Sequence, residues 1–223
     1  MSVAHNVERP YTHEMVIVHR VFRREAALLP QLVRATQVGD IARAEQIARH
    51  VDEYVGGLHH HHGLEDELIW PLLCERAPLS DGLITRMQEQ HQLIDMTLAV
   101  VTDALSRWRR SADADSGESL ANGFDDHYNV LLRHLHDEET QILPLIADHL
   151  TVAEWDLVGT RGLERIPKNK LMLALGAILE DATEKERRYF LGKVPLVGRF
   201  LWRVVGRRQY AAQCRELRGP LAG

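Results

Sequence analysis

One short pattern occurs twice in this chain, and both copies have the composition of a helix. The segments HHGLEDELIWPLL, from His61, and HLHDEETQILPLI, from His134, align without a gap. Each carries His-x-x-x-Glu, followed six residues later by a proline. A His and a Glu four residues apart lie on one face of an α-helix, so both side chains can reach one metal ion or two adjacent ions. The repeat therefore favours a fold in which two helices turn these polar faces toward a common centre.

The rest of the chain also predicts helices. Long stretches place apolar residues three and four positions apart, and the sustained period-2 alternation that marks strands is absent. Pro and Gly residues and clusters of small polar residues punctuate these stretches. We expect four long helices at about 12–38, 40–75, 80–110 and 120–149, with Pro30 as a kink in the first and the polar stretch 111–119 as a linker.

The helices that the sequence predicts become shorter after about residue 150. Two capping boxes follow, TVAE at 151–154 and TEKE at 183–186, and they indicate the starts of shorter helices. We therefore expect four short helices in 151–223 and divide the chain into residues 1–150 and a C-terminal extension, residues 151–223. The predicted fold class is all-α, an up-down-up-down four-helix bundle with an extension of short helices.

The first and third expected helices each contribute one histidine, His19 and His91, at the depth of the repeat. In an up-down-up-down bundle, residues at equal depth on consecutive helices are equidistant from the turn that connects them. We therefore compared the midpoints between successive histidines of the series His19, His61, His91 and His134 with the expected turns. These midpoints fall at 39–40, just before Pro78 and within 111–115.

Six residues thus become candidate metal ligands in one layer of the bundle. Imidazole and carboxylate without thiolate suit iron, manganese or zinc better than copper(I), and two carboxylates able to bridge suit a pair of ions. A polar group on a helix is more often a surface residue. Six on faces that ought to be apolar would leave the core badly desolvated unless something coordinates them. The candidates are His19, His61, Glu65, His91, His134 and Glu138.

The run of four histidines, 59–62, leaves an alternative open. His61 has a counterpart in the second copy of the repeat, whereas His62 aligns with Leu135. The pair His62 and Asp66 has the same spacing as His61 and Glu65, so it is retained as a second possibility for the ligands on this helix. His59 and His60 are expected beside the site or in solvent.

Several other side chains near the repeat carry weaker expectations. Tyr54 and His127 each stand seven residues before a ligand histidine, where they either line the site or pack in the core. Arg23 and Asp95 either pair across the bundle or are solvated. We expect Cys74 to pack, and Trp70 and Leu143 to keep water from the site. The remaining histidines are expected at the surface: His5, His13, His50, His136 and His149.

Composition excludes several classes of protein. The formal net charge of −5 argues against a general nucleic-acid binder. Two distant cysteines, Cys74 and Cys214, give neither a disulfide framework nor a thiolate zinc site. The N-terminal residues lack the features of a signal peptide, and no stretch is apolar enough to span a membrane. We therefore expect a cytoplasmic protein that binds no nucleic acid; its oligomeric state is not indicated.

The segment FLGKVPLVGRFLWRVVGRRQYAAQCRELRG, near the C-terminus, is basic and amphipathic. Such a helix either lies on an anionic membrane surface or packs on its own domain or a protein partner. We expect the second arrangement, in which the segment docks across one end of the bundle and gates ligand entry, and so no membrane partner.

The ligand pattern resembles that of the hemerythrin-like (HHE cation-binding) family. The pattern H…HxxxE…H…HxxxE corresponds to His19, His61-Glu65, His91 and His134-Glu138, and the resemblance covers about residues 12–149. It implies a four-helix bundle with two iron ions joined by an oxo or hydroxo bridge, the carboxylates bridging and the histidines terminal. Manganese or zinc fits less well. The C-terminal extension is similar to tails of actinobacterial hemerythrin-like proteins.

The chain departs from the oxygen-carrying members in its third helix. Those proteins have two histidines one turn apart there, whereas His91 is followed one turn later by Asp95 and preceded by Met87. Glu138 also replaces the carriers' Asp, which lies one residue further along. We therefore expect one nitrogen ligand fewer, and peroxide chemistry at least as well supported as reversible oxygen carriage.

The resemblance implies reaction with dioxygen, peroxide or nitric oxide, in oxygen or iron handling or in the response to oxidative stress. No side chain stands out as a separate acid or base, so any enzymatic turnover should be iron-centred, as in a catalase-like decomposition of peroxide. Enzymatic activity itself is left open. The alternative hypothesis is a metal- or redox-sensing module that signals to a partner through its C-terminal helices.

Overall fold

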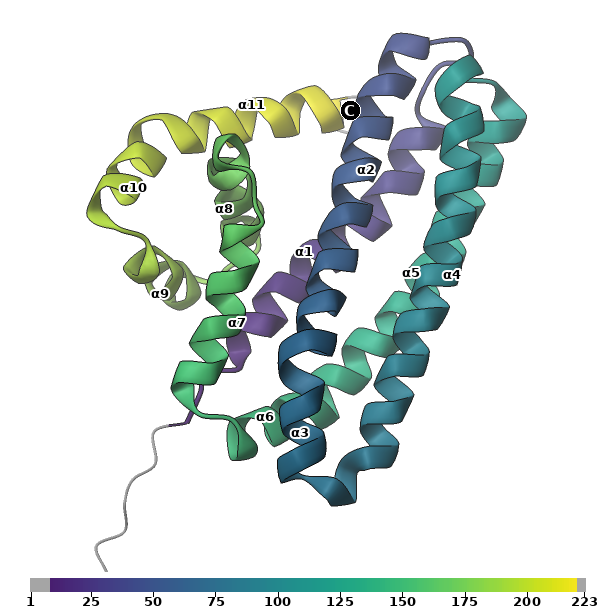
Figure 1. The fold of residues 1–223 in the computed structure, drawn as a ribbon. Coiled ribbons are helices and arrows are strands. Elements are labelled where there is room, and N and C mark those ends of the chain that lie inside the picture. The colour runs from purple at the N-terminus through teal and green to yellow at the C-terminus, as the bar shows by residue number, and fades with distance from the viewer. Residues whose placement is uncertain (1–8, 220–223) are drawn as a thin grey trace, which may run out of the picture.

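Four long antiparallel helices form the body of the protein in a computed structural model that describes residues 9–219. Each long helix packs against the next in the chain, and the last also packs against the first, so the bundle has the expected up-down-up-down topology (Figure 1). The all-α prediction is confirmed, since the described residues contain no strand. The long helices are α1 (His13–Arg34), α2 (Ile41–Leu64), α4 (Asp81–Ser111) and α5 (Ala114–Asp137).

Two of these helices continue beyond a widened turn at the repeat. α2 runs through the π-helical turn Glu65–Ile69 into α3 (Trp70–Arg76). α5 does the same through Glu138–Ile142 into α6 (Leu143–His149). Proline cannot donate to the carbonyl four residues earlier and its ring crowds that carbonyl, so a turn with wider hydrogen bonding ahead of it lets the helix continue. The repeated proline thus explains why each copy has a π turn that begins at its glutamate.

The polar stretch 111–119 is not a linker, so this prediction was wrong. Only Ala112 and Asp113 form the turn, with Ala112 in the left-handed region at φ 49°. The Asp113 side chain accepts a hydrogen bond from the Ser116 backbone N–H at 2.9 Å and so caps α5. Gly117 lets this first turn approach the Trp108 ring on α4. The small polar residues therefore begin a helix instead of connecting two.

The first helix is also shorter than predicted. It passes through Pro30 and ends at Arg34, four residues before the expected end. Gly39, at φ 82°, then turns the chain, and its N–H donates to the Ala112 carbonyl at 2.9 Å. Two turns at the same end of the bundle are therefore joined directly.

The apolar core is divided into two clusters by a polar layer. One cluster is centred on residues such as Leu29, Val51 and Phe124, and the other on residues such as Ile69, Met87 and Ile146. Between them lie side chains that are almost fully buried although they are polar: His19, His62, Glu65, His91, His134 and Glu138.

The extension contains the four helical segments that we expected after residue 150. They are α7 (Val152–Glu164), α8 (Leu171–Glu180), α9 (Glu184–Lys193), and α10 (Leu196–Leu201), which continues through the π-helical turn Trp202–Gly206 into α11 (Arg207–Arg218). Both predicted capping boxes are present, at the starts of α7 and α9. No helix within residues 9–219 is long and apolar enough to cross a membrane.

The extension lies along the side of the bundle formed by α1 and α2, and not across one end as we expected (Figure 1). α7 packs on α2, and α8 packs on α1. Ion pairs fasten it: Glu186 binds Arg20 at 2.9 Å, Glu154 binds Arg76 at 2.6 Å, and Arg218 reaches Glu25 at 3.3 Å. The boundary near residue 150, as the limit of an independent domain, stays a prediction.

Close packing of α11 on α8 depends on Gly176. A Cβ added there would overlap the Tyr210 ring, whereas a Cβ at Gly192 of α9 would meet no atom within 4 Å. We expect Gly176→Ala to lower the free energy of unfolding by about 1–3 kcal/mol, the usual cost of overpacking. Gly192→Ala should leave it unchanged or slightly higher. Urea unfolding followed by circular dichroism measures both, and equal midpoints for the two variants would contradict this packing.

Candidate metal centre

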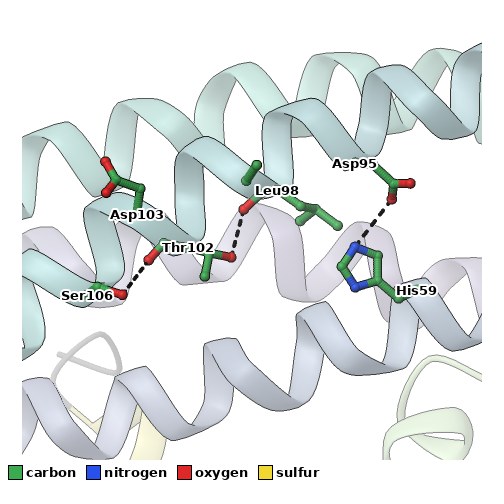
Figure 2. Close-up of a pocket in the computed structure, with 7 residues that line it drawn as sticks. His59, Asp95, Leu98, Thr102, Asp103 and Ser106 are labelled. Atoms are coloured by element: carbon green, nitrogen blue, oxygen red, sulfur yellow. Dashed lines mark hydrogen bonds and ion pairs between the residues drawn. The ribbon is translucent and has the colours of Figure 1, made fainter.

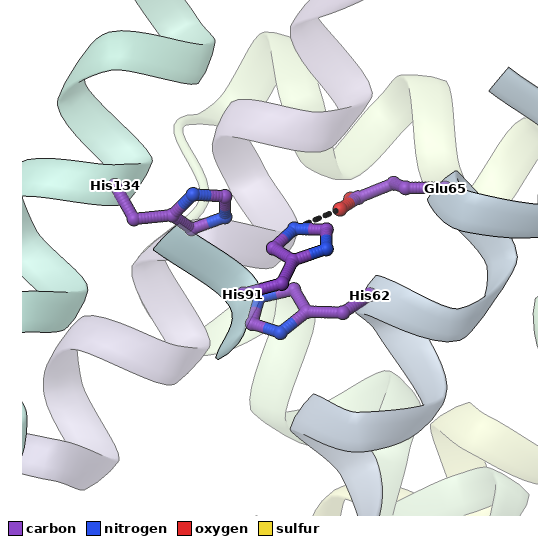
Figure 3. A group of neighbouring side chains, drawn as sticks. All are labelled: His62, Glu65, His91 and His134. Atoms are coloured by element: carbon purple, nitrogen blue, oxygen red, sulfur yellow. Dashed lines mark ion pairs between the residues drawn. The ribbon is translucent and has the colours of Figure 1, made fainter. Parts of the chain in front are cut away.

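All six residues predicted as ligands lie in or beside the polar layer, and together with His62 they form two overlapping groups. Within each group, the candidate ligand atoms lie within 4.8 Å of one another. Glu65 belongs to both groups. The first group, drawn in Figure 3, is His62, Glu65, His91 and His134; the second is His19, His61, Glu65 and Glu138.

The distances between the candidate ligand atoms are those of a coordination shell. The two oxygens of Glu65 face different groups, since Oε1 lies 3.0 Å from His61 Nε2 and Oε2 lies 3.3 Å from His91 Nε2. His19 Nε2 lies 3.3 Å from Glu138 Oε2. Ligands at right angles around an ion, each about 2.1 Å from it, are about 3 Å apart. Glu65 therefore directs one carboxylate oxygen toward each group.

Many of these atoms have no hydrogen-bond partner although they are buried. Both carboxylate oxygens of Glu65 and Glu138 are in this state, as are Nε2 of His91 and His134 and both ring nitrogens of His62. Leaving a buried charged or polar group without a partner is costly, on the order of several kcal/mol for a carboxylate. Cations held between these atoms would satisfy them, so the donor set fits metal ions.

The electrostatics of the layer keep most imidazoles neutral, the state in which they bind metal. Burial lowers the pKa of His61 to about 3 and that of His134 to about 4. His19 and His91 differ. Burial lowers the pKa of each, but the adjacent carboxylates outweigh this: Glu138 raises the pKa of His19 to about 9, and Glu65 raises that of His91 above its usual value. Burial together with the charge of Glu138 raises the pKa of Glu65 to about 7. A metal ion must therefore displace a proton from His19 to bind there.

Three of the candidate histidines are oriented through their second ring nitrogen. His19 Nδ1 lies 2.9 Å from Glu139 Oε1, and Glu139 also binds Arg23. His91 Nδ1 lies 3.0 Å from Asp66 Oδ1. An acceptor at Nδ1 fixes the proton there and leaves the Nε2 lone pair free for a metal, which is how metal-binding histidines are usually held.

The third oriented histidine uses an amide. His134 Nδ1 lies 3.3 Å from Gln90 Oε1, and Gln90 in turn donates to Asp137 at 2.8 Å. None of these orienting side chains was identified from the sequence as a partner of a ligand. They lie on other helices than the histidine they hold, so no spacing within one helix could have indicated them.

The choice between His61 and His62 was a false alternative, because both face the centre. His61 belongs to the second group and His62 to the first. Asp66, proposed with His62, instead has a half-exposed side chain that accepts from His91 and from Trp70 Nε1. His62 and Glu65 are three residues apart and share a helix face. This spacing could have identified His62, but an alignment of the repeat finds only positions that both copies share.

A fifth imidazole therefore offers a candidate replacement for the nitrogen ligand expected to be missing from the third helix. His91 is the candidate ligand that α4 contributes, as predicted, but α2 supplies two histidines instead of one. Five imidazoles face the centre, three in the first group and two in the second.

Tyr54 and His127 meet in the core and lie outside both metal groups. The Tyr54 hydroxyl and His127 Nε2 are 2.6 Å apart, and His127 Nδ1 lies 2.9 Å from Thr97 Oγ1. Arg23 and Asp95 do not pair with each other, since Arg23 binds Glu139 and Asp95 binds His59.

His59 and Asp95 line an open groove between α2 and α4 (Figure 2). None of the candidate ligands lines it. The neighbouring His60 lies 3.4 Å from Arg165 of the extension.

The predictions for three residues outside both groups were wrong. His13 and His50 are not simple surface residues, because they bind Glu186 and Glu25 at 2.7 and 2.8 Å. Cys74 is exposed and does not pack as expected. Trp70 and Leu143 are buried, as expected, in the apolar cluster beside the polar layer. His5 lies outside the described residues.

Comparison with known proteins gives one match. The family model described as the hemerythrin HHE cation binding domain matches residues 11–146. No curated protein and no solved structure matches the chain significantly. The matched range spans the bundle with its two repeat copies and stops before the extension, so it does not bear on the resemblance of the extension to actinobacterial proteins.

Replacing His61 and His62 one at a time tests whether both are ligands. We expect His61→Ala and His62→Ala each to lower the metal bound per chain, because each removes an imidazole from a different group. His59→Ala, which changes an exposed neighbour in the same run, should retain the full content. Metal analysis after loading and dialysis measures this, and full metal content in His62→Ala would refute its assignment.

Proposed function

Because the chain belongs to the hemerythrin HHE cation-binding family, we propose that its bundle holds two iron ions and reacts there with dioxygen, peroxide or nitric oxide. The observation that carries this proposal is the pair of buried groups that share Glu65. A single group would suit one ion, whereas two groups with a common carboxylate suit two adjacent ions.

The proposed ligands divide between the ions by group. His62, His91 and His134 would hold one ion, and His19 and His61 the other. Glu65 would bridge, and Glu138 would complete the second group, with Oε2 also 3.7 Å from His134 Nε2. Imidazole with carboxylate suits iron, with manganese and zinc as weaker candidates.

Each group offers four candidate side chains, three imidazoles with Glu65 in the first and two imidazoles with Glu65 and Glu138 in the second. An ion held by four side chains can keep a coordination position free for a small external ligand. Bound iron would supply Lewis acidity and redox chemistry at this position. The chain's part is to fix the ligands and exclude water: Ile69 and Met87, one turn from Glu65 and His91, are fully buried.

Turnover, if it is the protein's role, is proposed to be iron-centred. The buried titratable side chains of the polar layer are all candidate ligands, which leaves none of them as an independent acid or base. Decomposition of peroxide fits this arrangement, in a role in oxygen or iron handling or in the response to oxidative stress. With five imidazoles at the centre, the number of nitrogen ligands no longer argues against reversible binding of dioxygen.

The shared carboxylate gives a test of the two-ion proposal. We expect about two irons per chain in iron-loaded protein, with charge-transfer absorption in the near ultraviolet. Glu65→Ala should lose both irons, because it removes a ligand from each group, whereas His19→Ala and His91→Ala should each lose mainly one. Glu89→Gln, an exposed carboxylate on α4, is the control.

Metal analysis and absorption spectra measure these outcomes. Retention of one iron by Glu65→Ala would contradict the bridging role. A spectrum of the reduced protein that does not change with dioxygen, peroxide or nitric oxide would contradict the proposed reactivity.

A second candidate function, metal or redox sensing, is favoured by one contact. Arg165, at the end of α7, lies 3.1 Å from Glu67 and 3.4 Å from His60, which flank the ligand segment 61–65. A shift of the ligand turn on metal binding would therefore reach the extension.

We expect iron to slow proteolysis within 151–219 if the extension reports on the metal. Arg165→Ala should remove the difference between the metal-free and loaded proteins, since it breaks the contact with the ligand segment. Arg161→Ala, whose partner Glu164 lies within α7, should preserve it. Limited proteolysis with mass spectrometry measures the rates, and equal rates with and without iron in the unaltered protein would reject the sensing hypothesis.

A further inference from the structure

The helical run from α10 to α11 is apolar on two sides, and only one of them is covered. On the inner side, Trp202, Gly206 and Tyr210 pack toward α8. A Cβ at Gly206 would lie 2.6 Å from the Trp202 ring and 3.1 Å from Met172 Sδ, and Tyr210 rests on Gly176. This side accounts for the packing on its own chain that we expected of the segment.

The outer side carries a continuous apolar stripe that no described residue covers. Its members follow the period of a helix, in pairs one turn apart, and remain 45–75% exposed. Figure 1 shows α10 at the edge of the extension that lies away from α4 and α5. The stripe consists of Leu196, Val197, Phe200, Leu201, Val204 and Val205.

A basic row borders this stripe. Arg199, Arg203 and Arg207 are spaced one turn apart, and Arg208 follows them. All four are exposed, and none of them forms an ion pair with a carboxylate among residues 9–219. Elsewhere in the extension, Lys193, Arg165 and Arg218 each bind an acidic partner. The run Phe190–Arg208 contains no acidic residue, although the chain as a whole has a net charge of −5.

We propose that this outer face is a binding surface for anionic phospholipid bilayers. The helix would lie in the plane of the interface, with Phe200 and its apolar neighbours among the upper acyl chains and the four arginines at the phosphate groups. Long arginine side chains can reach the headgroups while the apolar stripe is buried. The metal centre would then sit at a membrane surface, held there by the extension.

Length and charge favour this occupant. Ten residues from Leu196 to Val205 extend about 15 Å, half the thickness of the hydrocarbon layer, so the stripe can lie on a bilayer but not cross it. A second copy of the chain, packed stripe to stripe, would bring two unpaired arginine rows together, which like-charge repulsion opposes. An anionic bilayer would bury the apolar stripe and also place phosphate groups beside the arginine row.

The test is co-sedimentation of the full-length, metal-loaded protein with vesicles. We expect it to bind vesicles of mixed phosphatidylglycerol and phosphatidylcholine, to bind pure phosphatidylcholine far less, and to dissociate as salt is raised. Val197→Asn with Phe200→Asn should abolish binding. Arg199→Gln with Arg203→Gln should lower the partition coefficient about 25-fold, since each basic residue near an anionic surface contributes about fivefold.

Matched control variants distinguish binding by this surface from nonspecific adsorption to vesicles. Leu79→Asn changes the most exposed apolar side chain elsewhere, and Arg133→Gln changes an exposed arginine on α5. Both should bind like the unaltered protein, and all variants should keep their iron content and helical circular dichroism. Absence of binding to anionic vesicles would overturn the proposal, as would binding that the stripe variants do not reduce. Self-association that is lost in Val197→Asn with Phe200→Asn, without vesicle binding, would identify a second copy as the occupant instead.

Discussion

The burial of two carboxylates and five imidazoles in one layer of a helical bundle is the constraint on which the rest of the structure depends. Glu65 and Glu138 are inaccessible to solvent and their oxygens have no hydrogen-bond partner. Such a layer is unfavourable in an apolar core unless cations neutralise and coordinate it. The apolar clusters on either side hold the helices that carry it, and the same clusters shield it from solvent.

Local helix geometry is adapted to this layer. Glu65 and Glu138 each begin a π turn, and each of these two turns precedes a proline that an α-helix could not accommodate without losing a hydrogen bond. The widened turn is thus placed by the repeat itself. Side chains on other helices then fix the rings: Glu139 holds His19, Asp66 holds His91 and Gln90 holds His134. The centre is therefore a property of the assembled bundle more than of any one helix.

The extension combines contact with the bundle and an uncovered face. Ion pairs such as Arg20–Glu186 and Glu25–Arg218 join it to the bundle, and Arg165 reaches the segment that bears His61, His62 and Glu65. The outward side of its last helices carries an exposed apolar stripe and arginines that form no ion pair within residues 9–219. One side of the extension thus faces the metal-binding bundle, while the opposite side is exposed and can bind an extended surface such as the proposed bilayer.

The sequence by itself determined the helices, their order and the depth of the site. Periodicity and capping are local, so the four long helices and both capping boxes could be predicted. The equal spacing of His19, His61, His91 and His134 from the turns placed them in one layer. Predictions failed where local signals were ambiguous: the polar residues 111–119 suit a linker, but Asp113 caps a helix there.

Only the tertiary structure decided which side chains meet. The rotation of each helix about its axis directs both His61 and His62 inward, and packing between helices brings Asp66, Gln90 and Glu139 to histidines far away in the chain. The same holds for the last helix, whose sequence is apolar on two sides. Contact with α8 selects the side that is buried, because a helix can turn only one face to its neighbour. Spacing within a helix specifies a face, whereas the partner of that face depends on the arrangement of all the helices.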